Sequence, residues 1–298
     1  MKVLLTGSNG QLGGAIKSYK PNGINLIETN RKILDLAIEE DCKEKVKIFK
    51  PDWIINAGAY TNVDKAETNF KESFAVNSLA PKFFSEAINL NNCKLLHIST
   101  DYVFDGQSSV AYKPYDKLNP LNVYGATKAK GEKNIEEILG WGNKAIILRS
   151  SWVMGPNHDN FLSTIIKLLK KNKKISVVSD QFSCPTSTST LALMCWEIIK
   201  KQEVIFNLNR NPIPIFHCCD KGVASWYDVA KLILDFGLEI GILQDSTKIV
   251  PVSTKAYNSI AKRPLFSLLD CESSFEKISF SSNQWEVELY KNMSKIVL

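Results

Sequence analysis

The sequence has 298 residues, 44% of them hydrophobic and 23% charged, which is the composition of a globular protein with one large domain or two modest ones. No apolar run approaches the roughly 20 residues of a membrane span, and the short run Val3–Leu5 is followed closely by a glycine. Neither a membrane segment nor a signal peptide is expected, so we predict a cytoplasmic protein with no membrane partner.

The net charge of +6 comes almost entirely from lysine. It suits a polyanionic small molecule, and it equally suits a lysine-rich proteome in which the excess has no function. No basic run carries interleaved aromatic residues, so nucleic-acid binding is not expected. The seven cysteines are irregularly spaced without a C-x-x-C pair, and there are only three histidines. We therefore assign no metal ligand, expect no disulfide framework, and predict reduced, mostly buried thiols.

Short apolar strands alternate with helices through the first half of the chain. In chain order we predict strands at Lys2–Leu5, Ile24–Glu28, Trp53–Asn56, Leu95–Ser99 and Ala145–Leu148. Between them we predict helices at Gln11–Ser18, Glu39–Phe49, Phe70–Leu90 (interrupted near Pro81) and Tyr124–Leu139. This alternation is typical of an α/β protein, with a Rossmann-type doubly wound parallel sheet covered by helices on both faces.

The alternation weakens after about residue 150. There we predict helices at Asn160–Lys171, Thr188–Lys201 and Ser225–Phe236, the last capped by Ser225, and strands at Ile175–Val178 and Ile215–Cys218. A loop-rich stretch follows at Val250–Leu269. We therefore predict an NAD(P)-binding Rossmann domain over residues 1–150 and a smaller, C-terminal substrate-binding region over residues 151–298. Later segments of the second part are expected to return to the first.

A glycine-rich turn follows the first predicted strand, with Gly7, Gly10 and Gly13 spaced as G-x-x-G-x-x-G. In a dinucleotide-binding turn Gly7 permits the tight bend, Gly10 lets the backbone approach the phosphates, and Gly13 lets the helix pack closely on the strand. The helix that follows offers free N–H groups and a partial positive charge to the pyrophosphate. This context predicts a dinucleotide site rather than a plain glycine turn.

The residues after the second strand bear on the choice between NADP and NAD. NAD-binding sites usually place a carboxylate at this strand end for the ribose hydroxyls. Here Asn30 is followed by Arg31 and Lys32, two cations that suit a 2′-phosphate. We therefore favour NADP. NAD stays open, because Glu28 could serve the ribose and the two cations could be solvated surface charges.

Three residues carry a pattern suited to proton transfer. Tyr124 and Lys128 stand four apart at the start of a predicted helix, which places them on one face, and Thr100 follows the fourth strand. A neighbouring ammonium is expected to lower the pKa of the tyrosine, so that the phenol becomes a usable proton donor. The Thr100 hydroxyl is expected to hold the substrate oxygen beside it. Together with the glycine turn, this order of motifs predicts an oxidoreductase.

Over nearly its whole length the sequence resembles the dTDP-4-dehydrorhamnose reductase family of extended short-chain dehydrogenases. The stretches at Thr61–Glu67 and Ser99–Gly106 are the most specific to that family. The other matching stretches are Thr6–Gly13, Asp52–Asn56, Ala57–Tyr60, Asn77, Pro120–Glu132, Arg149–Val153, Asp180–Phe182, Pro185–Thr186 and Arg263–Pro264.

The resemblance implies that a hydride from NAD(P)H attacks C4 of dTDP-4-dehydro-β-L-rhamnose and that Tyr124 protonates the oxygen, giving dTDP-β-L-rhamnose. It implies that Lys128 binds the nicotinamide ribose and that Thr100 orients the keto group. Besides Tyr124, Lys128 and the three glycines, the expected cofactor residues are Asn9, Gln11, Leu12, Asn30, Arg31, Asp35, Leu36, Ala57, Ala59, Tyr60, Asn77 and Ser99. The residues expected at the nucleotide-sugar substrate, besides Thr100 and Tyr124, are Val63, Asp64, Tyr102 and Trp152.

Several points stay open at this level. Ser183 and Met154 depart from the family pattern, where a glycine and an aromatic residue are usual, and Asp64 could instead cap a helix. A reductase or epimerase of another nucleotide sugar would share the same catalytic residues. A non-catalytic NADP-binding subunit like the regulatory subunit of methionine adenosyltransferase, which resembles the same family, is the other alternative. The intact set of Thr100, Tyr124 and Lys128 argues for an enzyme, because a pure binding module need not keep all three. The resemblance also allows a homodimer and a divalent cation such as Mg²⁺, for which no residue is assigned.

Overall fold

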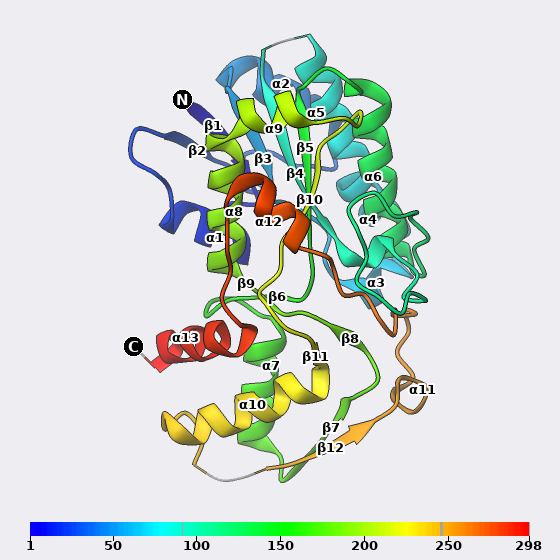
Figure 1. Ribbon diagram of the computed structural model, residues 1–298, viewed down its shortest axis with the longest axis vertical. Helices are drawn as coiled ribbons and strands as arrows, with labels where there is room; N and C mark the ends of the chain where they lie inside the picture. The colour runs from blue at the N-terminus through cyan, green and yellow to red at the C-terminus, as the bar shows by residue number, and fades with distance from the viewer. Residues whose placement is uncertain (91, 245–246, 298) are drawn as a thin grey trace.

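The computed structural model describes residues 1–90, 92–244 and 247–297. Its centre is a six-stranded parallel sheet with the strand order β10-β5-β4-β3-β1-β2 (Figure 1). The strands are β1 (Lys2–Thr6), β2 (Asn25–Glu28), β3 (Trp53–Asn56), β4 (Lys94–Thr100), β5 (Ala145–Ser150) and β10 (Ile215–His217). The predicted α/β class with a Rossmann-type parallel sheet is confirmed.

Helices cover both faces of the sheet, because alternate strand residues point to opposite sides. Val3 and Leu5 belong to the apolar core on one face, whereas Leu4 belongs to the core on the other. The first core is closed by α1 (Gln11–Ser18) and α8 (Thr188–Lys200), and the second by α2 (Glu39–Phe49), α5 (Ala80–Asn89) and α6 (Val123–Leu139). The near-continuous apolar strands are thus explained by burial on two sides.

The strand order reverses at β1, which lies between β2 and β3. Ligands of open parallel sheets bind beyond the carboxyl ends of the strands at such a reversal point. The chain leaves β1 into the glycine turn and leaves β3 into the stretch that begins at Ala57. The fold therefore brings these two loops to one crevice.

The long helical stretch predicted over Phe70–Leu90 has a different form from the expected one. It consists of α4 (Phe70–Phe74), a π-helical segment at Ala75–Leu79 and α5, in unbroken succession. Pro81 lies in the first turn of α5, where a missing N–H is tolerated, so the departure from α-helix comes before the proline.

The second part of the chain lies below the sheet in Figure 1, with its own apolar core. Its elements, with the short pieces that join it to the sheet, are β6 (Val153–Met154), α7 (Phe161–Lys171), β7 (Lys174–Val178), β8 (Phe182–Ser183), β9 (Thr186–Ser187), β11 (Ala224–Ser225), α10 (Trp226–Glu239), β12 (Lys248–Val252), α11 (Thr254–Tyr257) and α13 (Trp285–Val297). Two later helices, α9 (Gln202–Leu208) and α12 (Glu272–Ile278), pack instead on the sheet with α8 (Figure 1). β12 pairs with β7, so the stretch predicted as loop-rich begins with a strand.

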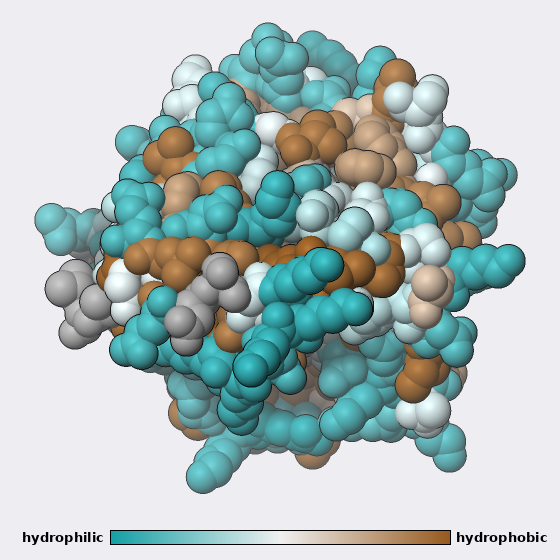
Figure 2. All heavy atoms as spheres, turned by 90° about the horizontal axis from the view of Figure 1, so that it is seen from below, coloured by the Kyte–Doolittle hydropathy of each residue, from teal (hydrophilic) through white to brown (hydrophobic). Residues whose placement is uncertain are grey.

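Figure 2 shows this lower end of the molecule, where a band of hydrophobic residues crosses a mostly hydrophilic face. The helix α10 begins as predicted, because Ser225 caps it and Asp228 completes a capping box. Among the described residues, no helix is both long and apolar enough to cross a membrane.

Candidate active site

A pocket of about 680 Å³ opens between the sheet and the second part of the chain. Its walls include Gly7 and Ala57 from the loops after β1 and β3, Tyr124 from α6, and Phe161 and Trp226 from α7 and α10. The carboxyl edge of the sheet supplies one side and the second part supplies the other.

The glycine turn forms a cradle at the sheet side of this pocket. Gly7 has φ +65°, and a Cβ there would lie 2.7 Å from the Cα of Gly58. A Cβ on Gly13 would lie 2.2 Å from the carbonyl oxygen of Gly7, so only glycine allows α1 to start so close to β1. The N-terminus of α1 has no side-chain cap, and Gly10, Gln11, Leu12 and Gly13 line the pocket. Uncapped N–H groups at this point suit an anion.

Ser99 gives a second sign that the pocket is built for a polar ligand. Its side chain lines the pocket and is almost completely buried, and within the described part of the chain its Oγ has no hydrogen-bond partner. A buried hydroxyl without a partner is uncommon in a folded protein. The glycine cradle and this hydroxyl together fit the dinucleotide that the sequence predicts.

Tyr124 and Thr100 lie against each other in the pocket. Tyr124 is in the first turn of α6, which begins there because Asn122 accepts a hydrogen bond from the N–H of Gly125. Thr100 ends β4 and lines the same pocket as Tyr124, and its hydroxyl lies near enough to the phenol to lower the pKa of Tyr124. Burial raises the pKa of Tyr124 to about 12, and the Thr100 hydroxyl acts in the opposite direction. The pocket therefore contains all three residues predicted to be catalytic, Thr100, Tyr124 and Lys128.

Lys128 also lines the pocket, one turn along α6 from Tyr124, but it does not act on the phenol as predicted. Its Nζ donates a hydrogen bond to the carbonyl oxygen of Ile98 at 2.5 Å, and the groups that shift the pKa of Tyr124 do not include it. Burial lowers the pKa of Lys128 to about 8, partly offset by Glu132. The expected lowering of the tyrosine pKa by this ammonium is therefore absent, because the ammonium is turned to the backbone.

A buried polar chain runs behind Lys128 to the cofactor loops. The Nε2 of His97 lies 3.5 Å from the Nζ of Lys128, and its Nδ1 lies 3.1 Å from the amide nitrogen of Asn56. Asn56 accepts a hydrogen bond from Thr6, whose hydroxyl in turn accepts one from the N–H of Gly58. This chain ties the lysine to the loop after β3.

The opposite wall carries aromatic side chains. Trp152, which has φ +46°, stacks on Trp226 with ring centroids 3.6 Å apart, and Phe161 packs against Trp226 at 4.4 Å. Val63 and Tyr102 also line the pocket, as expected for substrate residues. A flat ring or a sugar face fits such a wall.

Asp64 is not among the residues that line the pocket, but it pairs with Arg263, which does line it. Asn62, not Asp64, caps the short helix α3 (Val63–Ala66), since its side chain accepts from the N–H of Lys65. The alternative interpretation of Asp64 as a helix cap is therefore wrong.

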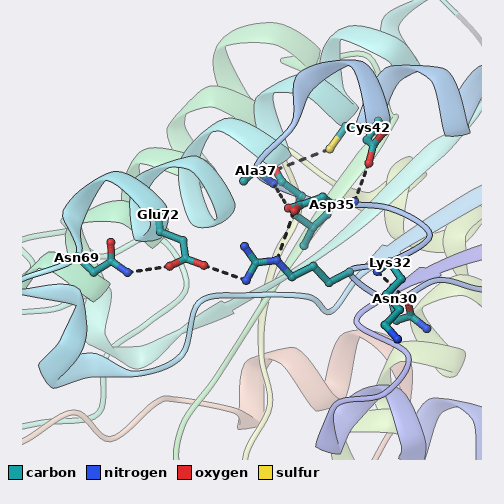
Figure 3. A network of polar contacts seen from close by, with 10 residues as sticks. Asn30, Lys32, Asp35, Ala37, Cys42, Asn69 and Glu72 are labelled. Carbon is teal, nitrogen blue, oxygen red and sulfur yellow. Dashed lines mark hydrogen bonds and ion pairs between the residues drawn. The ribbon is translucent and has the colours of Figure 1, made fainter.

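The cations predicted for a 2′-phosphate lie at the end of β2 and do not line the pocket. Arg31 is exposed and forms ion pairs with Asp35 at 3.3 Å and with Glu72 at 3.0 Å. Figure 3 shows this network, in which Asn69 also donates to Glu72 and the side chain of Asn30 accepts from the N–H of Lys32.

The remaining predicted cofactor residues divide into two groups. Ala57, Ala59 and Ser99 line the pocket, whereas Asn9, Leu36, Tyr60 and Asn77 do not. Asn77 is buried and holds the backbone of Tyr60 through both its N–H and its carbonyl oxygen. Leu36 is buried against Gly58, so both residues support the loop after β3 from behind.

Sequence reasoning missed several residues of the pocket. Arg263, Trp226, Phe161 and Asp101 line it, and none was assigned a role. Only Asp101 carried a local signal, a carboxylate directly after a strand that ends in Ser-Thr. The aromatic residues and Arg263 come from the second part of the chain and reach the pocket only through its fold. Among the described residues, no cluster of three or more histidine, cysteine, aspartate or glutamate side chains is arranged for a metal ion.

The comparisons with known proteins agree with this geometry. Residues 1–297 match the family model described as RmlD substrate binding domain. The chain is 34% identical over 287 residues to a dTDP-4-dehydrorhamnose reductase of Aggregatibacter actinomycetemcomitans, with 96% of both chains covered. The crystal structure of a dTDP-4-dehydrorhamnose reductase from Clostridium acetobutylicum is similar with a TM-score of 0.90, 32% identity and 100% of both chains covered. A reductase of that name from Bacillus anthracis, solved in complex with NADP, gives a TM-score of 0.88 at 30% identity over 99% of both chains.

Proposed function

The chain belongs to the family of dTDP-4-dehydrorhamnose reductases, as its resemblance predicted, and from this premise we propose that it reduces the C4 keto group of dTDP-4-dehydro-β-L-rhamnose to give dTDP-β-L-rhamnose. The observation that carries the proposal is that Thr100, Tyr124 and Lys128 line one pocket together with the glycine cradle. A proton donor and a dinucleotide cradle in one pocket are what a carbonyl reduction by hydride transfer requires.

The cofactor of this reaction is NADPH. A bound NADPH supplies the hydride, and a relative of this chain was solved with NADP. The N-terminus of α1 would hold the pyrophosphate, Gly10 would let the backbone approach it without a side chain in the way, and Ser99 would offer its hydroxyl to the cofactor. Arg31 and Lys32 lie at the strand end where the adenosine ribose of such folds binds, which favours the 2′-phosphate. NADH fits the same cradle without that contact.

The protein's own residues hold the substrate oxygen and supply the proton. Tyr124 donates its phenolic proton to the oxygen that gains negative charge at C4, with Thr100 beside it as the second hydroxyl. Lys128, fixed by Ile98 and close to His97, holds the ribose hydroxyls next to the phenol. The high pKa of Tyr124 keeps the phenol protonated before the reaction, as a proton donor must be.

The substrate occupies the side of the pocket formed by the second part of the chain. Trp152, Trp226 and Phe161 form an apolar wall for the flat and apolar parts of the nucleotide sugar. Arg263, held by Asp64, offers a cation to the diphosphate or to a sugar hydroxyl. With this division we expect the reacting carbon to lie between Thr100 and the cofactor cradle.

The direct test is a coupled assay of the purified protein on dTDP-4-dehydro-6-deoxy sugars with NADPH and with NADH. We expect consumption of NADPH and formation of dTDP-β-L-rhamnose, identified by mass spectrometry and proton NMR. Turnover with another 4-keto sugar nucleotide alone would assign a different substrate. Binding of NADP without turnover of any of these sugars would contradict the enzymatic assignment and favour a regulatory subunit.

Three further expectations from the sequence stay predictions. A cytoplasmic location is consistent with described cysteines that are all free thiols. A homodimer can be checked by sedimentation equilibrium of the purified protein. Dependence on a divalent cation can be checked by adding a chelator to the assay and to the sedimentation sample.

A further inference from the structure

Asp101 is a buried carboxyl group next to the proposed catalytic hydroxyls. It follows Thr100 directly at the end of β4 and is only 2% exposed. One carboxyl oxygen, Oδ1, lies 3.0 Å from the Oγ of Thr100. The other, Oδ2, accepts a hydrogen bond of 2.6 Å from the hydroxyl of Ser267. The Thr100 hydroxyl also acts on the phenol of Tyr124, whose pKa it lowers, and both residues line the pocket.

The Thr100 hydroxyl has one proton, for which the Asp101 carboxylate and an oxygen in the pocket compete. Its Oγ already accepts a hydrogen bond of 3.2 Å from the N–H of Tyr102. An ionised carboxylate has no proton to donate, so an ionised Asp101 takes the Thr100 proton at Oδ1. In that state Thr100 can only accept from Tyr124, and it has no proton for an oxygen in the pocket.

We propose that Asp101 is a positioning residue whose own protonation turns the Thr100 hydroxyl toward the pocket. A protonated Asp101 donates its O–H to the Oγ of Thr100, and the Thr100 proton then points to the oxygen that gains negative charge. No proton leaves either residue in this rearrangement, which only reverses the direction of one hydrogen bond. The inference rests on the proposed reduction, because it assigns a function to Thr100 in that reaction.

The surroundings of Asp101 favour the protonated form of its carboxyl group up to near neutral pH. Burial raises the pKa of Asp101 to about 7, against the opposing effect of the hydroxyls of Ser267 and Thr100 and of nearby N–H groups. The titratable groups that face it are Tyr102, Tyr124 and Cys219. None of these three side chains carries a positive charge, so none of them favours the carboxylate.

The direction of the pH effect follows from this arrangement. Below the pKa of Asp101 the acid is protonated and Thr100 is a donor to the pocket; above it Thr100 is lost as a donor. We therefore expect kcat/KM for the reduction to fall by at least about tenfold as the pH rises through about 7. Lys128, whose pKa is about 8, contributes a separate limb at higher pH.

Asp101→Asn and Ser267→Ala test this in opposite ways. An amide at position 101 donates to Thr100 at every pH and still accepts from Ser267, so kcat/KM should be flat through the pH range in which the wild type falls. Removing the Ser267 hydroxyl withdraws a hydrogen-bond donor from the carboxylate and raises the pKa of Asp101 further. The fall of kcat/KM should therefore move to higher pH. The matched control is Asp220→Asn, which changes another buried carboxyl group with a pKa of about 7 outside the pocket and should keep the wild-type limb.

Infrared spectra of the protein without ligands give a readout that does not depend on turnover. Asp101 and Asp220 both contribute bands of protonated carboxyl groups that disappear as the pH rises through about 7. In the Asp220→Asn background the remaining band should be missing when Asp101→Asn is added and displaced to higher pH when Ser267→Ala is added. The proposal would be overturned if the fall of kcat/KM kept the wild-type midpoint pH in both variants. It would also be overturned if Asp101 were ionised over the whole pH range of the titration. If the Asn variant does not fold, the Ser267→Ala shift alone decides. A wild type without turnover would count against the proposed function, whereas the infrared titration would still decide whether Asp101 is protonated.

Discussion

Arg263 holds both carboxylate oxygens of Asp64, with Nη2 2.7 Å from Oδ2 and Nη1 3.1 Å from Oδ1. The N–H of Ala261 donates to the same carboxylate, and these contacts keep the pKa of Asp64 below its usual value. Arg263 lines the pocket, as does Tyr102. Asp64 therefore fixes the position of a pocket cation from outside the pocket.

The first prediction concerns this pair. Asp64→Asn removes the charge and one of the two parallel hydrogen bonds, so Arg263 loses its fixed orientation at the substrate. We expect kcat/KM to fall by roughly tenfold, mainly through KM, while stability changes by less than about 1 kcal/mol because the pair is partly exposed. Initial rates and thermal unfolding measure the two effects.

The control for this prediction is Glu86→Gln, which breaks the surface pair of Glu86 with Lys43 away from the pocket. It should leave the kinetics unchanged. Wild-type kinetics in Asp64→Asn would mean that Arg263 keeps its position without the carboxylate, and Asp64 would then have no part in the site.

The second prediction concerns cofactor choice. Glu72 and Asp35 neutralise Arg31, so a 2′-phosphate must compete with them for the guanidinium. Replacing Arg31 and Lys32 by alanine should weaken NADPH relative to NADH by at least about tenfold. Glu72→Gln should act in the opposite direction, because it frees the guanidinium, and should tighten NADPH while leaving NADH unchanged.

Fluorescence titration of both reduced cofactors against each variant measures this preference. Equal weakening of NADPH and NADH in the double alanine variant would show that these cations do not contact the 2′-phosphate. An unchanged NADPH affinity in Glu72→Gln would show that the ion pair does not limit Arg31.

The features predicted correctly from the sequence are those encoded by neighbouring residues. Gly7 and Gly13 pack against the same turn that contains them, and Tyr124 and Lys128 share one helix face, so spacing was enough to find them. The apolar strands were found because parallel strands covered on two sides are continuously apolar. Their boundaries agree with the structure to within one or two residues.

The features that sequence analysis missed depend on contacts between distant segments. Asp64 meets Arg263 from 199 positions away, and Ser267 reaches Asp101 across 166 positions. The predicted lowering of the Tyr124 pKa by Lys128 was wrong for a related reason. Spacing places the lysine on the same face as Tyr124, but its ammonium donates a hydrogen bond to the carbonyl oxygen of Ile98 on the packed strand β4. Local patterns contain no information about such partners.

The third prediction concerns the proton donor. Tyr124→Phe removes the hydroxyl with little change in volume, so the fold and NADPH binding should persist. Turnover should fall by roughly 10²–10⁴-fold, the usual contribution of a general acid. Stopped-flow measurement of NADPH oxidation separates this loss from slower product release. A variant within about threefold of the wild type would remove Tyr124 from the mechanism.

The last prediction links Asp220 to the pH dependence of stability. Its carboxyl oxygens accept from the Thr190 hydroxyl at 2.6 Å and from the N–H of Ser187 at 2.7 Å, yet burial raises its pKa to about 7. Between about pH 4 and pH 7 the folded protein therefore binds more protons at this site than the unfolded chain, whose aspartate titrates near 3.9. The free energy of unfolding should decrease as the pH rises through that window, by up to roughly 1.4 kcal/mol per pH unit from this group.

Asp220→Asn has no charge to bury at this site, so it is not destabilised in the same way. The free energy of unfolding of the variant minus that of the wild type should therefore increase steadily from about pH 4 to pH 7 and then level off. Urea titrations at several pH values measure this difference, and Asp101→Asn should give the same trend because the pKa of Asp101 is raised for the same reason. A difference that is constant across the window would mean that the Asp220 carboxyl group is ionised in the folded protein at all these pH values.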